Sequence, residues 1–87
     1  MRVKYHKSFV KNYNKRFGGN KKIKEQYKKR LQLFIKDPQN PILKNHRLIG
    51  RKLSLRTFSV TGDVRVIYYQ KGNTAYFLDI GTHSQVY

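Results

Sequence analysis

The N-terminal half of the chain repeats apolar residues at the spacing of amphipathic helices. One series falls at helical steps: Phe9, Val10, Tyr13 and Phe17. A second series falls at steps of four, four and three: Ile23, Tyr27, Leu31 and Phe34. Ser8 is placed to cap the first helix, Gly18 ends it, and Pro38 ends the second because proline disfavours helix at the residue before it. The pattern predicts two helices, each with one apolar stripe, after a short strand over residues 2–6, where polar and apolar residues alternate.

From Leu53 onward the period of the apolar residues changes to two, which is the period of a strand. Strands are expected over residues 53–60, 64–69 and 74–80, separated by turns over residues 61–63 and 71–73. Two helices followed by a run of strands indicate an α+β fold, in which two N-terminal helices pack on a small, mostly antiparallel sheet. The length of 87 residues is that of a single domain, residues 1–87.

The first predicted hairpin has a register that sorts its side chains onto two faces. With a three-residue loop, one face holds mostly apolar pairs: Val60 and Val64, Phe58 and Val66, Arg56 and Tyr68. The other face holds the remaining pairs: Ser59 and Arg65, Thr57 and Ile67, Leu55 and Tyr69. Because a slip of one residue would mix the two sets, we expect the first face to pack on the helices and the second to be open. In the second hairpin Phe77 and Asp79 share a face, which leaves its register open.

The chain is strongly positive. Its 20 Lys and Arg face 4 Asp and Glu, a formal net charge of +16. Such a charge opposes folding through self-repulsion, so we expect a polyanionic partner: nucleic acid, an acidic membrane surface or an acidic protein. The absence of cysteine excludes disulfides and thiolate chemistry. No signal peptide and no apolar run of membrane-spanning length is visible, so we expect a cytoplasmic protein without membrane association.

The residues available for catalysis favour metal-free chemistry. The 3 histidines lack ligand-like spacing and the 4 acids offer little to a hard cation, so neither a metal nor another cofactor is expected. RNA carries its own nucleophile, the 2′-OH. An enzyme that uses it must remove the 2′ proton, stabilise the charge on the phosphorane and protonate the departing 5′-oxygen. Histidine suits the proton transfers and arginine the phosphate, and the products would be a 2′,3′-cyclic phosphate and a 5′-OH.

Three segments of the C-terminal half resemble one superfamily of bacterial toxins. Residues 45–50, Asn-His-Arg-Leu-Ile-Gly, resemble the N/D-H-x-L-x-G box of YafQ-like toxins. Residues 56–68 resemble the central hairpin of the RelE/ParE superfamily with its R-x-x-Y ending, and residues 79–87 resemble the family's closing strand and tail. Three such segments in this order make the chain similar to the YafQ-like mRNA interferases. The resemblance implies the RelE-like microbial ribonuclease fold.

The resemblance also implies an activity and partners. Members of this family are toxins of type II toxin–antitoxin systems, and they are ribosome-dependent endoribonucleases that cut mRNA in the A site. A co-encoded antitoxin neutralises them. We therefore expect this chain to contact mRNA and ribosomal RNA, and we expect an acidic segment of a cognate antitoxin to wrap its basic face.

Residue-by-residue transfer from the family gives candidate catalytic residues. His46 occupies the histidine of the first box, and Asp63 matches the acid of the hairpin turn. Arg65 matches the phosphate-binding arginine of RelE and YoeB-type relatives. His83 matches the expected general acid, and Tyr87 matches the aromatic residue near the family's C-terminus. Four further basic residues are expected to bind RNA: Arg47, Arg51, Lys52 and Arg56.

The chain departs from the family at one position. YafQ-like toxins have a histidine where this chain has Ser59, and serine is a poor general base at neutral pH. The proton acceptor is then either His46 or Asp63, or the 2′-OH is activated mainly by charge.

Three alternatives from other classes stay open. A ParE-type gyrase inhibitor would share the fold, but such proteins generally lack residues equivalent to His83 and Tyr87. A non-catalytic RNA-binding module would stack bases on exposed aromatic side chains, for which Tyr69 and Tyr87 are candidates. An inactive relative of the nucleases is the third alternative, because Ser59 breaks the family pattern.

Overall fold

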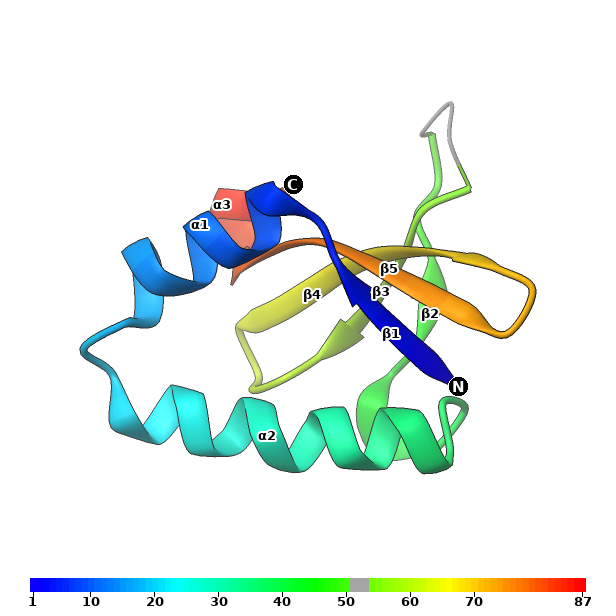
Figure 1. The fold of residues 1–87 in the computed structure, drawn as a ribbon, viewed down its shortest axis with the longest axis horizontal. Coiled ribbons are helices and arrows are strands. Elements are labelled where there is room, and N and C mark those ends of the chain that lie inside the picture. The colour runs from blue at the N-terminus through cyan, green and yellow to red at the C-terminus, as the bar shows by residue number, and fades with distance from the viewer. Residues whose placement is uncertain (51–53) are drawn as a thin grey trace.

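The computed structural model describes residues 1–50 and 54–87. Within them, five strands form one sheet in the order β1-β5-β4-β3-β2, with β1 parallel to β5 and the other pairs antiparallel (Figure 1). The elements in chain order are β1 (Arg2–Tyr5), α1 (Lys7–Phe17), α2 (Lys21–Lys36), the 3-10 helix η1 (Pro41–Leu43), β2 (His46–Arg47), β3 (Arg56–Ser59), β4 (Val64–Lys71), β5 (Thr74–Thr82) and α3 (His83–Val86). The prediction of two N-terminal helices packed on a small, mostly antiparallel sheet is confirmed.

The β3–β4 hairpin has the register that the sequence predicts. Phe58 pairs with Val66, and Ser59 pairs with Arg65. The predicted inner face is buried and belongs to the hydrophobic core: Phe58, Val60, Val64, Val66 and Tyr68. The opposite face is less open than predicted, because Thr57 and Ser59 are buried as well. The hydroxyl of Thr57 is bonded by Tyr87 and that of Ser59 by Arg65.

A β-bulge in β5 settles the register of the second hairpin. Ile67 pairs with Asp79, whereas the next residue of β4, Tyr68, pairs with Phe77. Leu78 is therefore the extra residue between them. The bulge lets Phe77 point into the core while Asp79 points to the opposite face, which resolves the conflict that strict alternation would create.

The core is centred on an aromatic ring from α2. Phe34 is fully buried, and its ring stacks on Phe58 with ring centroids 4.6 Å apart. It also meets the edges of Tyr68 and Phe77, at centroid distances of 5.0 and 5.6 Å. One residue thus joins α2 to β3, β4 and β5, and it holds the helix against the sheet.

Replacing Phe34 by alanine is expected to lower the free energy of unfolding by about 3–5 kcal/mol, because the change removes a buried ring and leaves a cavity. Denaturant titration of the variant measures the loss. Ile35→Ala on the same helix is the matched control: Ile35 is 42% exposed, and its loss is expected to be about 0.5 kcal/mol. Equal losses in the two variants would contradict this account of the core.

Helix α1 continues along the edge of β5 beyond the end of β1. Ser8, Asn12 and Arg16 follow one another at four-residue steps on one face of the helix. The hydroxyl of Ser8 donates to the carbonyl oxygen of Leu78, and Arg16 Nη1 donates to the carbonyl oxygen of Ile80 at 2.9 Å. The polar face of α1 therefore supplies hydrogen-bond donors to carbonyl oxygens of β5 beyond the end of β1.

The predicted N-cap of the first helix is wrong. Ser8 lies inside α1, and the cap is His6, whose Nδ1 accepts a hydrogen bond from the backbone N–H of Ser8 at 3.2 Å. Ser8 cannot serve as the cap because its hydroxyl is bonded to β5. His6 is thus the residue that caps the start of α1.

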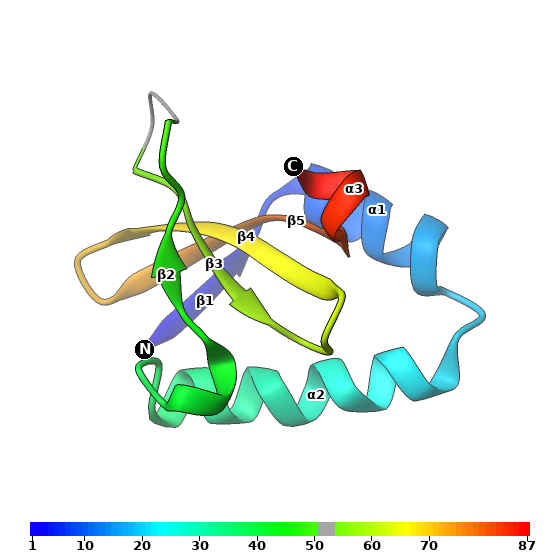
Figure 2. The same cartoon turned by 180° about the vertical axis from the view of Figure 1, so that it is seen from behind.

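Three short elements and several strand ends differ from the predictions. The elements η1, β2 and α3 were not predicted from the sequence. The third strand is observed only over Arg56–Ser59, and residue 53 of the predicted 53–60 strand lies outside the described residues. β4 and β5 each end two residues later than predicted, at Lys71 and Thr82. Figure 2 shows β2 crossing beside β3, where it forms one edge of the sheet.

Candidate active site

The C-terminal helix α3 is fastened to the end of β5 by its first turn. Gln85 Oε1 accepts a hydrogen bond from the backbone N–H of Thr82 at 2.8 Å, which closes a capping box. Gly81 makes room for this turn. A Cβ atom there would lie 2.7 Å from Arg16 Nη1 and 2.8 Å from Gln85 Oε1, closer than non-bonded atoms approach. The missing side chain thus allows α1 and α3 to meet over the same point of β5.

His83 is the first residue of α3, and contacts fix it from two sides. Its backbone N–H donates to Asp63 Oδ1 at 3.2 Å, which ties α3 to the β3–β4 turn. Its ring meets that of Tyr87 in a T-shaped contact with centroids 4.4 Å apart. The side chain itself is exposed. His83 therefore presents its imidazole to solvent from a backbone held in place.

Tyr87 lies against the sheet. Its hydroxyl donates to Thr57 Oγ1 at 3.1 Å, and its backbone N–H donates to the carbonyl oxygen of His83 at 3.0 Å. Thr57 has no exposed surface, whereas the Tyr87 side chain remains 38% exposed. The hydroxyl is thus anchored to a buried partner, and the ring lies beside His83.

Arg65 is the second residue of β4 and lies on the same face of the sheet as Thr57 and Ser59. Its Nη1 donates to the hydroxyl oxygen of Ser59 at 2.9 Å, and Ser59 is its cross-strand partner. Ser59 is only 4% exposed, while Arg65 is half-buried. On its other side Arg65 pairs with Gly81, two residues before His83. Ser59 therefore orients the guanidinium next to the base of α3.

His46 belongs to the same face, although it makes no contact with His83. It lies on β2 and pairs with Thr57, the residue that binds Tyr87. Its Nδ1 is 2.8 Å from the carbonyl oxygen of Lys44. Because a carbonyl oxygen can only accept, Nδ1 carries the hydrogen, and Nε2 is the ring nitrogen able to take up a proton.

Of the basic residues predicted to bind RNA, the structure describes Arg47 and Arg56. Arg47 and Arg56 pair with each other on the other face of the sheet, and Arg56 Nε donates to Asn45 Oδ1 at 3.1 Å. The Asn45 amide in turn bonds the hydroxyl of Tyr68. Together with neighbouring polar residues the two arginines line a pocket of about 200 Å³: Arg47, Ser54, Arg56 and Gln70. Arg51 and Lys52 lie outside the described residues.

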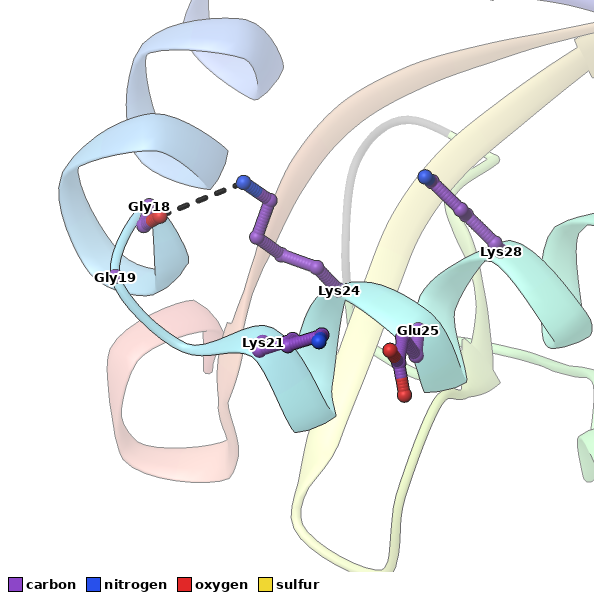
Figure 3. Close-up of a pocket in the computed structure, with 6 residues that line it drawn as sticks. All are labelled: Gly18, Gly19, Lys21, Lys24, Glu25 and Lys28. Carbon is purple, nitrogen blue, oxygen red and sulfur yellow. Dashed lines mark hydrogen bonds between the residues drawn. The ribbon is translucent and has the colours of Figure 1, made fainter.

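A second basic pocket lies at the turn between α1 and α2 (Figure 3). It has a volume of about 300 Å³ and these lining residues: Gly18, Gly19, Lys21, Lys24, Glu25 and Lys28. Figure 3 shows Lys24 reaching back to Gly18, whose carbonyl oxygen accepts a bond from Nζ at 3.4 Å. The pocket contains no histidine and is built from other elements than the cluster around His83. No helix within residues 1–50 and 54–87 is long and apolar enough to cross a membrane.

Gly81→Ala is expected to displace α3 and to lower the free energy of unfolding, because the added Cβ would collide with the Arg16 and Gln85 side chains. The shift would be measured from the NMR resonances of His83 and from denaturant unfolding. Gly19→Ala is the matched control, since a Cβ there meets nothing within 4 Å. Unchanged His83 resonances in Gly81→Ala would contradict the packing described for α3.

The residues that hold the cluster together were not predicted from the sequence. Thr82 and Gln85 have the Thr-x-x-Gln spacing of a capping box, so α3 carried a recognisable signal. Thr57 and Gly81 carried none, because their roles depend on contacts with Tyr87, Arg16 and α3 that only the folded chain brings about.

Comparison with known proteins gives one family and several similar structures. A model of the YafQ toxin family, described as a bacterial toxin of type II toxin–antitoxin systems, matches residues 1–87. A metal-bound toxin from Helicobacter pylori is 25% identical, with 100% of this chain and 99% of that chain covered and a TM-score of 0.77. A mutant of YafQ from E. coli and a chain of the E. coli DinJ–YafQ complex are each 23% identical, with the same coverage and TM-scores of 0.81. These last two show a shared fold. No curated protein gives a match.

Proposed function

The chain belongs to the YafQ family of toxins of bacterial type II toxin–antitoxin systems, and we propose that it is an endoribonuclease that cuts mRNA in the ribosomal A site. The observation that carries the proposal is the cluster on one face of the sheet. There His83 contacts Tyr87 and Asp63, and Arg65 projects beside them from the strand that pairs with Gly81. The cluster combines an exposed imidazole with a held guanidinium, which suits cleavage of an RNA phosphodiester.

The proposed reaction uses the 2′-OH of the substrate as nucleophile. The 2′-oxygen attacks the adjacent phosphorus, and its proton passes to His46 Nε2. Arg65 binds the non-bridging oxygens and stabilises the phosphorane through charge-assisted hydrogen bonds. The bond from phosphorus to the 5′-oxygen then breaks, and protonated His83 gives its proton to that oxygen. The products are a 2′,3′-cyclic phosphate and a 5′-OH.

His46 is the preferred proton acceptor among the groups that the sequence left open. The Asp63 carboxylate already accepts the backbone N–H of His83, which supports a positioning role. The Ser59 hydroxyl accepts from Arg65 and is buried. The Nδ1 of His46 is held by the carbonyl oxygen of Lys44, which leaves Nε2 for the proton.

The test of the function uses purified protein, ribosomes and a defined mRNA. We expect cleavage within the codon held in the A site and fragments that end in a 2′,3′-cyclic phosphate. Cleavage of the same mRNA without ribosomes would contradict the proposed dependence on the ribosome. Absence of cleavage together with inhibition of gyrase supercoiling would favour the ParE-type alternative.

We further propose that a cognate antitoxin binds the basic surface through an acidic segment in the cytoplasm. The formal charge of +16 supports this, and YafQ of E. coli forms a complex with DinJ. Isothermal titration with the product of the adjacent gene is expected to give tight binding that weakens as salt is added, since salt screens exposed charges. No heat of binding, or binding that salt leaves unchanged, would contradict this partner.

A further inference from the structure

Two tyrosines stack on the sheet beyond the candidate active site. Tyr69 of β4 and Tyr76 of β5 are cross-strand partners, and their rings are nearly parallel, with centroids 4.8 Å apart and an interplanar angle of 11°. The residues beside them, Tyr68 and Phe77, point into the core. Because side chains alternate along a strand, the stacked pair lies on the opposite face. Tyr69 is 36% exposed there.

This face is the one that carries the candidate active site. Along β4 the alternation places Arg65 and Tyr69 on the same side, with Ile67 between them. Four residues of a strand separate the two side chains by about 13 Å. An RNA strand whose phosphate is bound at Arg65 can therefore pass over Tyr69 a short run of nucleotides away.

Cations flank the tyrosine pair. Lys4 of β1 pairs with Tyr76, so both lie on the same face, and Lys71 follows two residues after Tyr69 on β4. Both lysines are exposed. A flat aromatic surface between positive charges is the arrangement with which proteins bind single-stranded nucleic acid, because every base can stack and every nucleotide has a phosphate. An acidic protein segment would gain from the lysines but would have no need of two parallel rings.

We propose that Tyr69 is a stacking platform for a base of single-stranded RNA, with Tyr76 supporting its ring from behind and Lys4 and Lys71 at the neighbouring phosphates. The inference rests on the proposed function, since it extends the path of the same substrate across the sheet. It differs from a purely structural cross-strand pair in one consequence: the exposed ring contributes to RNA affinity.

The test measures binding of a labelled oligouridylate whose 2′-hydroxyls are all methylated, so that the probe cannot be cleaved through a 2′-OH. Fluorescence anisotropy gives the dissociation constant for the wild type, Tyr69→Val and Tyr69→Phe. Valine keeps a strand-forming residue without the ring, and we expect it to weaken binding roughly tenfold to a hundredfold. Phenylalanine keeps the ring and is expected to bind as the wild type does. Lys4→Gln is expected to reduce the log–log salt slope by about 0.7, a slope that Tyr69→Val leaves unchanged.

Several outcomes would overturn the platform. They are a wild type that does not bind the probe, Tyr69→Val with wild-type affinity, and Tyr69→Phe as weak as Tyr69→Val. Polyglutamate serves as the comparison probe: an equal loss of affinity for it in Tyr69→Val would indicate a surface for acidic protein instead. Because the RNA probe is not cleaved, its binding is independent of catalysis. A protein that binds it through Tyr69 and cuts no mRNA would refute the proposed function and keep the platform.

Discussion

His83→Ala is expected to lower the rate of RNA cleavage by about 100- to 10,000-fold, the range that a positioned general acid contributes. The fold should be kept, because the His83 contacts that tie α3 to Asp63 and Tyr87 use its backbone N–H and carbonyl groups. The side chain itself is exposed, and its ring makes a T-shaped contact with the ring of Tyr87. Single-turnover cleavage on programmed ribosomes measures the loss, and thermal unfolding verifies the fold.

His6→Asn is the matched control for this variant. His6 is also an exposed histidine, but it caps α1 and has no part in the cluster around His83. Asparagine is a good N-cap residue, so the variant removes an imidazole and keeps the helix start. A comparable loss of cleavage in both variants would mean that His83 acts through general stability or charge.

Arg65→Ala is expected to lower the cleavage rate by about 100- to 1,000-fold, as does the loss of a group that stabilises charge in a transition state. Part of the fall in activity would come from a loss of stability, because the buried hydroxyl of Ser59 would lose the hydrogen bond that Arg65 donates to it. Unfolding measurements on the same variant separate this cost in stability from the loss of catalysis.

Arg65→Lys tests what the guanidinium supplies. Lysine keeps the charge but has no planar fork of donors, so we expect an intermediate rate. Ser59→Ala keeps Arg65 and removes only its hydrogen-bond acceptor at 2.9 Å, so its loss is expected to be smaller than that of Arg65→Ala. Full activity in Arg65→Ala would contradict the proposed role in phosphate binding.

The sequence predicted the first hairpin well because its two faces differ in composition. Placing Phe58 opposite Val66 and Ser59 opposite Arg65 kept apolar residues together, and any one-residue slip would have mixed them. The stripe that contains Tyr27 placed α2 for the same reason. Hydrophobic periodicity predicts an element well where one of its sides is buried and the other is exposed to solvent.

The second hairpin could not be predicted because its solution breaks the periodicity. Strict alternation puts Phe77 and Asp79 on one face, and the chain avoids this with the extra residue Leu78. The conflict itself was the available signal, since a charged residue on a core face favours a bulge. Similarly, the strand β2 that carries His46 was not predicted, because a two-residue edge strand forms only through its pairing with β3.

The sequence proposed the candidate site residues but could not show how the fold brings them together. The structure places His83 in contact with Tyr87 and Asp63 and puts Arg65 opposite Gly81, and the sequence had no means of showing that Tyr87 binds Thr57. Nor could the sequence show where Arg56, a predicted RNA-binding residue, would lie. Its place opposite Tyr68 puts it on the other face of the sheet, where it bonds Asn45.

The most direct test of the account is primer extension on mRNA from cells that express the wild type or His83→Ala. The account predicts cuts inside translated codons in the first and their loss in the second, at equal protein levels. Growth arrest without cuts, or cuts that persist in His83→Ala, would contradict a ribonuclease centred on His83.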